Sequence, residues 1–97
     1  CAVTWRERAE RLHRRLAPWP VGAIEQRRYL VAALAGEAGE LVNLMCKDWR
    51  GECIEPRAMA DELADVAIYL HLAAQALGVD LDVACNRKTR ANDRRFP

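Results

Sequence analysis

The sequence predicts an all-α fold, a four-helix bundle formed by one domain over residues 1–97. Strand signals are sparse, because few residues are β-branched and no alternation of period two persists. Proline and glycine divide the chain into four segments with helical periodicity. With 52% hydrophobic and 30% charged residues, the composition suits amphipathic helices. A chain of 97 residues has a marginal core on its own, so we expect its helices to bury apolar stripes against a partner such as another copy of the chain.

The first two predicted helices are marked by their end signals. The first runs from about Thr4 to Ala17, because Thr4 and Glu7 fit a capping box. A break rich in proline follows. The second runs from about Ala23 to Arg50, and Gly51 is suited to end it.

The other two predicted helices are likewise marked by residues that start or end a helix. Pro56 is suited to the first turn of the third helix, which continues to Leu77 and stops at Gly78. Asp80 is suited to cap the fourth, from Leu81 to about Ala91. Only a short loop joins the two long central helices, so we expect them to pack antiparallel beside the two shorter ones.

Charge and cysteine content narrow the classes of protein. The net charge of +1 gives no overall field towards nucleic acid or membranes. The four cysteines form no C-x-x-C pair, which favours free thiols over a zinc or redox motif. No secretory signal is visible, and no apolar run approaches the roughly 20 residues of a membrane span. We therefore expect a cytoplasmic protein with no membrane partner.

Acidic residues interrupt the apolar face of the second predicted helix. Helical residues advance by about 100° each, which places Glu37 in the middle of a stripe of leucines. Glu40 lies at the edge of that stripe. The third predicted helix repeats the pattern, with Glu62 among apolar residues and Asp65 three positions later, beside Tyr69. Each central helix thus presents two acids from the surface that it should bury.

Buried carboxylates are costly unless a cation neutralises them. Hard divalent ions prefer such oxygen ligands, and magnesium or manganese fits an all-carboxylate set better than iron or zinc. We therefore expect Glu37, Glu40, Glu62 and Asp65 to bind Mg²⁺, with Mn²⁺ as the alternative, as one, two or more ions. The competing interpretation is that these acids pair with arginines or face water. Magnesium also shares its ligands with substrate phosphates, so the site suggests phosphate chemistry.

The spacing of these acids resembles a known family. The segments Glu37-Ala-Gly-Glu40 and Glu62-Leu-Ala-Asp65 are similar to the E-x-x-E and E-x-x-D signature of the MazG-like all-α nucleotide pyrophosphohydrolases. The ending from Lys88 to Pro97 resembles the K-x-x-x-N-x-R-R-[YF]-P ending of the dCTP pyrophosphatase branch. The resemblance implies magnesium-dependent hydrolysis of a nucleoside triphosphate to the monophosphate and pyrophosphate. It also implies dimers or dimers of dimers that clear surplus or modified deoxynucleotides.

The resemblance assigns roles by position. The four acids match metal and catalytic residues, with Glu37 our choice of base because it lies deepest in the stripe. The residues that match or resemble substrate contacts, or offer an aromatic face for the base, are Lys88, Asn92, Arg95, Tyr69, His13, Trp19 and Trp49. The branch has a tryptophan where this chain has Lys47, two positions before Trp49.

Each of these residues also has a structural interpretation. Lys88 borders an apolar face and can snorkel, and Asn92 can be a helix cap. Tyr69 can be a core aromatic, His13 a surface residue, and Arg95 part of a solvated tail. The competing function is a non-catalytic helical protein that binds nucleotides or nucleic acid through its basic ends, or that regulates a partner. No nucleic-acid-binding motif supports it, and it leaves the buried acids unexplained.

Overall fold

The computed structural model describes residues 2–16, 19–20 and 23–96 of the chain. Within these residues it contains four helices and no strand, which confirms the predicted all-α class. The helices are α1 (Trp5–Leu16), α2 (Ile24–Trp49), α3 (Pro56–Ala76) and α4 (Leu81–Arg95). The first three predicted ranges agree with these to within about one residue, although the predicted end of the first at Ala17 lies outside the described residues. The fourth helix is longer than predicted, because it continues past Ala91 to Arg95.

Local chemistry explains where the helices begin and end. The Thr4 hydroxyl accepts a hydrogen bond from the Glu7 backbone N–H (3.1 Å), and the Asp80 carboxylate accepts one from the Val83 N–H (3.1 Å). Both contacts satisfy a backbone donor that the first turn leaves free. Gly51 and Gly78 follow α2 and α3 at φ 91° and 70°, a region that strongly favours glycine.

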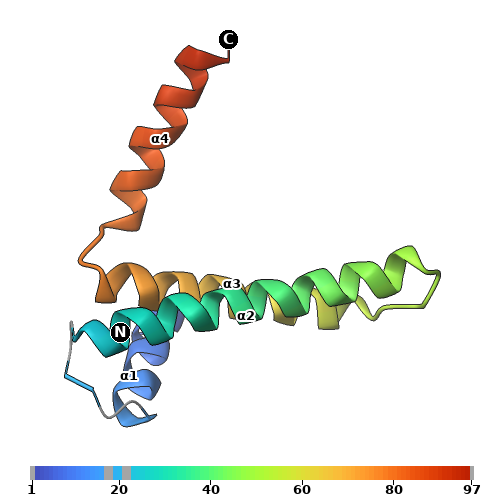
Figure 1. Cartoon of the computed structure of the whole chain (residues 1–97), viewed down its shortest axis with the longest axis horizontal. Coiled ribbons are helices and arrows are strands. Elements are labelled where there is room, and N and C mark those ends of the chain that lie inside the picture. The colour runs from blue at the N-terminus through green and yellow to red at the C-terminus, as the bar shows by residue number, and fades with distance from the viewer. Residues whose placement is uncertain (1, 17–18, 21–22, 97) are drawn as a thin grey trace.

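The helices α2 and α3 form an antiparallel hairpin, and α1 crosses α3 near the open end of that hairpin (Figure 1). The small core sits at this end. Leu30 of α2 is 1% exposed and packs with Leu72, Ala73 and Ala76 of α3. Ala9 of α1 packs against the same cluster. No described residue is fully buried in the half of the hairpin next to the Gly51 turn.

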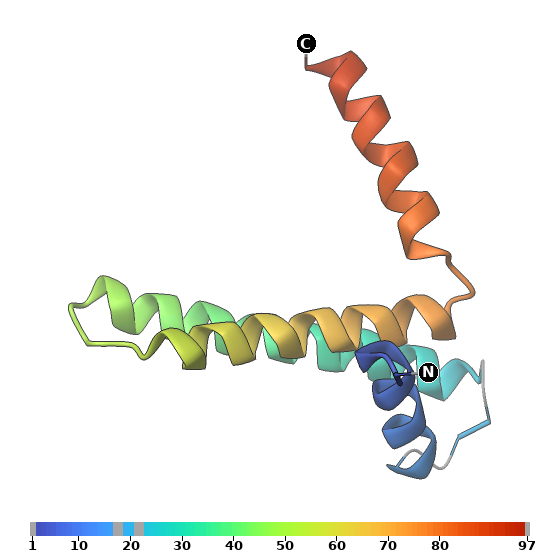
Figure 2. The same ribbon diagram turned by 180° about the vertical axis from the view of Figure 1, so that it is seen from behind.

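The fourth helix does not complete a bundle within one chain. It leaves α3 at an angle of 102° and projects away from the hairpin, as both views show (Figures 1 and 2). Within the described residues, one chain thus forms a three-helix unit with a projecting arm, and the predicted four-helix bundle is not confirmed. The reason is the short Gly78 turn, which ends α3 and starts α4 in a new direction before α4 can fold back. Val83 and Phe96 on this arm are 61% and 69% exposed.

One helix has a property that the sequence pattern did not predict. By length and hydropathy alone, α2 is long and apolar enough to cross a membrane, and α3 with α4 passes the same test only as one bent pair. Core helices of proteins outside membranes pass this test as well. Here α2 packs along α3, and Glu37 and Glu40 lie in its apolar stretch.

Candidate metal and nucleotide site

Three of the predicted acids meet between the two long helices. Carboxylate oxygens of Glu37 and Glu40 on α2 and of Glu62 on α3 lie within 4.8 Å of one another. The i, i+3 spacing brings Glu37 and Glu40 to one side of α2, and the antiparallel packing brings Glu62 opposite them. Asp65, half-buried one turn further along α3, acts electrostatically on both Glu37 and Glu62. The predicted set of four is therefore clustered.

Two carboxylate oxygens in this cluster have no hydrogen-bond partner among the residues that the structure describes. Glu37 Oε2 and Glu62 Oε2 are shielded from solvent, and no described residue gives either a hydrogen bond. The predicted alternative of pairing with arginine is not seen for them. A buried acceptor without a donor is costly, so such atoms need an explanation. A hard divalent cation, which prefers carboxylate oxygens, fits this donor set.

The electrostatics of the cluster agree with that fit. Burial raises the pKa of Glu37 above its ordinary value of 4.5, and the charges of Glu40 and Asp65 raise it further. Burial also raises the pKa of Glu62, and the charge of Glu40 adds to the effect. Without a cation, the site therefore favours the protonated acids.

This shift predicts how stability depends on pH. A carboxyl with a raised folded-state pKa stabilises the fold at low pH, and the effect is lost as pH rises through that pKa. We expect the melting temperature of metal-free protein to fall by a few degrees above about pH 4.5, and Mg²⁺ or Mn²⁺ to restore it at pH 7.5 more than at pH 5. Thermal melts at one protein concentration, with and without EDTA, measure this. Glu62→Gln should weaken both the fall in melting temperature with pH and its recovery on adding metal. Equal changes in the parent and the variant would contradict the assignment of Glu62 to the metal site.

A cavity of about 570 Å³ adjoins the carboxylates, within the size range of ligand pockets. Asp65 and Tyr69 of α3 line it on the side of the acids. Aromatic side chains line much of the rest: Trp5 of α1, Trp19 of the following segment and Tyr29 of α2. The rings of Trp19 and Tyr29 lie 5.2 Å apart at 44°. Such faces can stack on a nucleobase.

His13 lies in the same cavity and is held by a buried neighbour. The side-chain amide of Gln26 donates to His13 Nε2 (3.2 Å), which requires that this ring nitrogen carry no proton. Burial lowers the pKa of His13, which agrees with a neutral ring. Gln26, at 6% exposure, is the buried polar side chain of α2.

The structure brings some predicted substrate residues together and separates others. His13, Trp19 and Tyr69 line the cavity beside Asp65. Trp49 lies at the far end of α2, 89% exposed, and does not line it. Lys88, Asn92 and Arg95 are exposed on the projecting α4, so one chain alone does not bring them to the acids (Figure 1).

The cavity also contains residues that the sequence pattern did not single out. Tyr29 of α2 lines the cavity two turns before Glu37, whereas Gln26 does not line it and reaches it only through its hydrogen bond to His13. Helical periodicity could have singled out Tyr29, because it lies two turns from Glu37 and therefore near the same face of α2. Trp5 was expected only to pack the first helix, yet it lines the cavity as well.

Fold and site together define an all-α protein in which two antiparallel helices hold a carboxylate cluster next to an aromatic-lined cavity. No protein-family model matches the chain. It is 40% identical over 79 residues to dCTP pyrophosphatase 1 of Homo sapiens, an alignment that covers 74% of this chain and 46% of the human protein. It is 37% identical over 81 residues to dCTP pyrophosphatase 1 of Mus musculus and 38% to that of Bos taurus, with 74% of this chain and 46–47% of each relative covered.

The chain is therefore homologous to the dCTP pyrophosphatases, and its resemblance to that family is confirmed. It spans about half the length of the curated relatives that it matches.

Proposed function

We propose that this chain carries the metal and substrate site of a nucleoside triphosphate pyrophosphohydrolase that clears deoxynucleotides, with dCTP as the first candidate substrate. The observation that carries the proposal is the pair of buried carboxylate oxygens of Glu37 and Glu62, which lack a hydrogen-bond partner among the described residues. Their neighbour Asp65 lines a cavity of ligand size. The similarity to dCTP pyrophosphatases supports the reaction class. A non-catalytic binding or regulatory role leaves these oxygens without a purpose.

Glu37, Glu40, Glu62 and Asp65 would hold Mg²⁺, or Mn²⁺ in its place, as one or more ions. When bound, the cation neutralises triphosphate charge and polarises the attacked phosphorus. The carboxylates also orient a water molecule, and Glu37 accepts its proton as the water oxygen attacks the α-phosphorus. The bond from the α-phosphorus to its bridging oxygen breaks, and pyrophosphate leaves with that oxygen.

The aromatic cavity would receive the base and sugar. Trp19 and Tyr29 supply ring faces, and Tyr69 joins the cavity to the acids. The neutral His13, held by the Gln26 amide, supplies polar ring atoms at the wall. This division places the triphosphate over the acids and the nucleoside against α1.

The phosphate-binding residues on α4 would come from a second copy of the chain. We infer this because α4, which carries Lys88, Asn92 and Arg95, projects away from the hairpin of its own chain. Exposed apolar side chains, among them Val42, Met45 and Leu63 on the uncovered half of the hairpin, provide a surface for such a copy. The homodimer or homotetramer and the cytoplasmic location expected from the sequence stay predictions.

A nucleotide panel tests the reaction. We expect dCTP with Mg²⁺ to yield dCMP and pyrophosphate in equal amounts, and EDTA to abolish the release. Anion-exchange chromatography of the products distinguishes this from loss of a single phosphate, which would yield dCDP. The panel should include the other common deoxynucleotides and base-modified dCTP. If no triphosphate is cleaved with either metal, the proposed function is wrong.

A further inference from the structure

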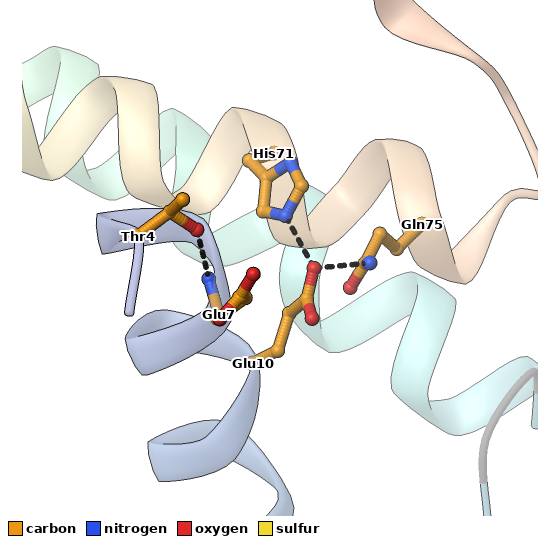
Figure 3. A network of polar contacts seen from close by, with 5 residues as sticks. All are labelled: Thr4, Glu7, Glu10, His71 and Gln75. Atoms are coloured by element: carbon orange, nitrogen blue, oxygen red, sulfur yellow. Dashed lines mark hydrogen bonds and ion pairs between the residues drawn. The ribbon is translucent and has the colours of Figure 1, made fainter. Parts of the chain in front are cut away.

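Glu10 of α1 makes a polar contact that the proposed reaction does not use. Its Oε1 accepts a hydrogen bond from His71 Nε2 (2.8 Å) and one from the Gln75 side-chain amide (2.5 Å), as Figure 3 shows. His71 and Gln75 lie one turn apart on α3, so a single carboxylate oxygen bridges to two positions on that helix. The side chains of His71 and Glu10 are only 16% and 22% exposed. We call this group of three residues the clasp.

The clasp matters because α1 has few other contacts with α3, and the hydrogen bond between His13 and Gln26 ties it to α2 instead. No residue of α1 is fully buried. Its apolar contact with the core is made by Ala9, a small side chain. Trp5 adds an edge contact to His71, with ring centroids 5.6 Å apart at 70°, and so supports the same member of the clasp. Little else fixes the position of α1 on α3.

The position of α1 determines the shape of the ligand cavity. This helix supplies one wall of it through Trp5, Arg8, Ala9, Leu12, His13 and Leu16. Glu10 does not line that cavity, because its carboxylate contacts His71 and Gln75 of α3 instead. A shift of α1 along or away from α3 would therefore move the cavity wall without touching the carboxylate cluster.

We propose that Glu10 is a positioning residue, which fixes α1 through the clasp and thereby holds the nucleoside wall of the cavity in place. The proposal rests on the proposed function in that the ligand is a nucleoside triphosphate. An exposed ion pair would contribute little, but here one acceptor satisfies two donors in a partly buried contact. Removing that acceptor leaves the His71 and Gln75 donors facing the gap between the helices.

The test compares three variants of the full chain. Glu10→Ala removes the acceptor, Glu10→Gln keeps an acceptor oxygen at the same place, and Glu7→Ala is the matched control on the exposed side of α1. For Glu10→Ala we expect KM for dCTP to rise about tenfold with kcat within about twofold, since the acids are untouched. Glu10→Gln and Glu7→Ala should stay within about twofold of the parent in both constants.

Hydrogen exchange followed by mass spectrometry tests the clasp without any turnover. We expect peptides of α1 to exchange faster in Glu10→Ala, while peptides of α2 and α3 stay unchanged. Unchanged exchange in α1, or equal acceleration in every helix, would overturn the proposal. So would an unchanged KM in a variant whose α1 is loosened. If the parent protein cleaves no nucleotide, the proposed function fails and exchange alone decides the clasp.

Discussion

Glu62→Gln should abolish pyrophosphate release while the protein stays folded. Glutamine keeps the size of the side chain but removes the charge that a divalent ion requires from it. A bound cation contributes several kcal/mol to a phosphoryl transition state, and each 1.36 kcal/mol changes the rate tenfold. We therefore expect kcat to fall by at least ~100-fold. Metal-free Glu62→Gln should melt no lower than the parent, because it removes a charge from a crowded group of acids.

Controls separate this effect from a general loss of charge. Glu55→Gln changes an exposed acid at the start of the same helix, where its side chain makes no capping hydrogen bond, and should leave kcat unchanged. Glu37→Gln should match Glu62→Gln, because both oxygens lack a partner in the described part of the chain. A Glu62→Gln protein that retains parental kcat would remove the basis of the proposed site.

Mixing two inactive variants should restore activity if α4 acts on a second copy. Lys88→Ala removes the proposed phosphate contact on α4, and we expect it alone to lower kcat/KM by about 100-fold, as loss of a charge-assisted contact allows. In a mixed dimer of Glu62→Gln and Lys88→Ala, one site has both lesions and the other has neither. Random pairing of equal amounts makes half of all dimers mixed, so about a quarter of parental activity should return.

The mixture must be assembled by co-expression or by joint unfolding and refolding, so that subunits exchange. A mixture of Glu62→Gln with Glu37→Gln is the matched control, because both lesions fall on the hairpin and no arrangement of α4 rescues them. If the first mixture stays as inactive as its parts, α4 does not complete the site of another chain, and the proposed assembly is wrong.

Much of the fold was predictable because its signals are local. Thr4, Asp80, Pro56 and the two glycines at positive φ act within a few residues, so they mark helix ends in the sequence itself. The clustering of Glu37 with Glu62 was predictable for a related reason. Helical periodicity puts each on an apolar face, and a short loop makes those faces meet.

The rest depends on angles between helices, which no local pattern encodes. The direction of α4 is set by the turn at Gly78, so the distance from Lys88 to the acids was not predictable. The contact of Glu10 with His71 depends on how α1 crosses α3, 61 positions later in the chain. Glu10 and His13 lie three positions apart on α1, yet the crossing brings Glu10 to α3 and His13 to the cavity.

The placement of the small core at one end of the hairpin has a mechanical consequence. Helix pairs open locally where few apolar contacts hold them. We therefore expect α2 and α3 to separate transiently near the Gly51 turn, while they stay packed at the Leu30 end. The four acids lie between the loosely packed end and the core end of the hairpin. A metal ion bound there would link α2 to α3 and keep the local opening from spreading towards Leu30. Metal binding would therefore also reduce the flexibility of the helices that hold the site.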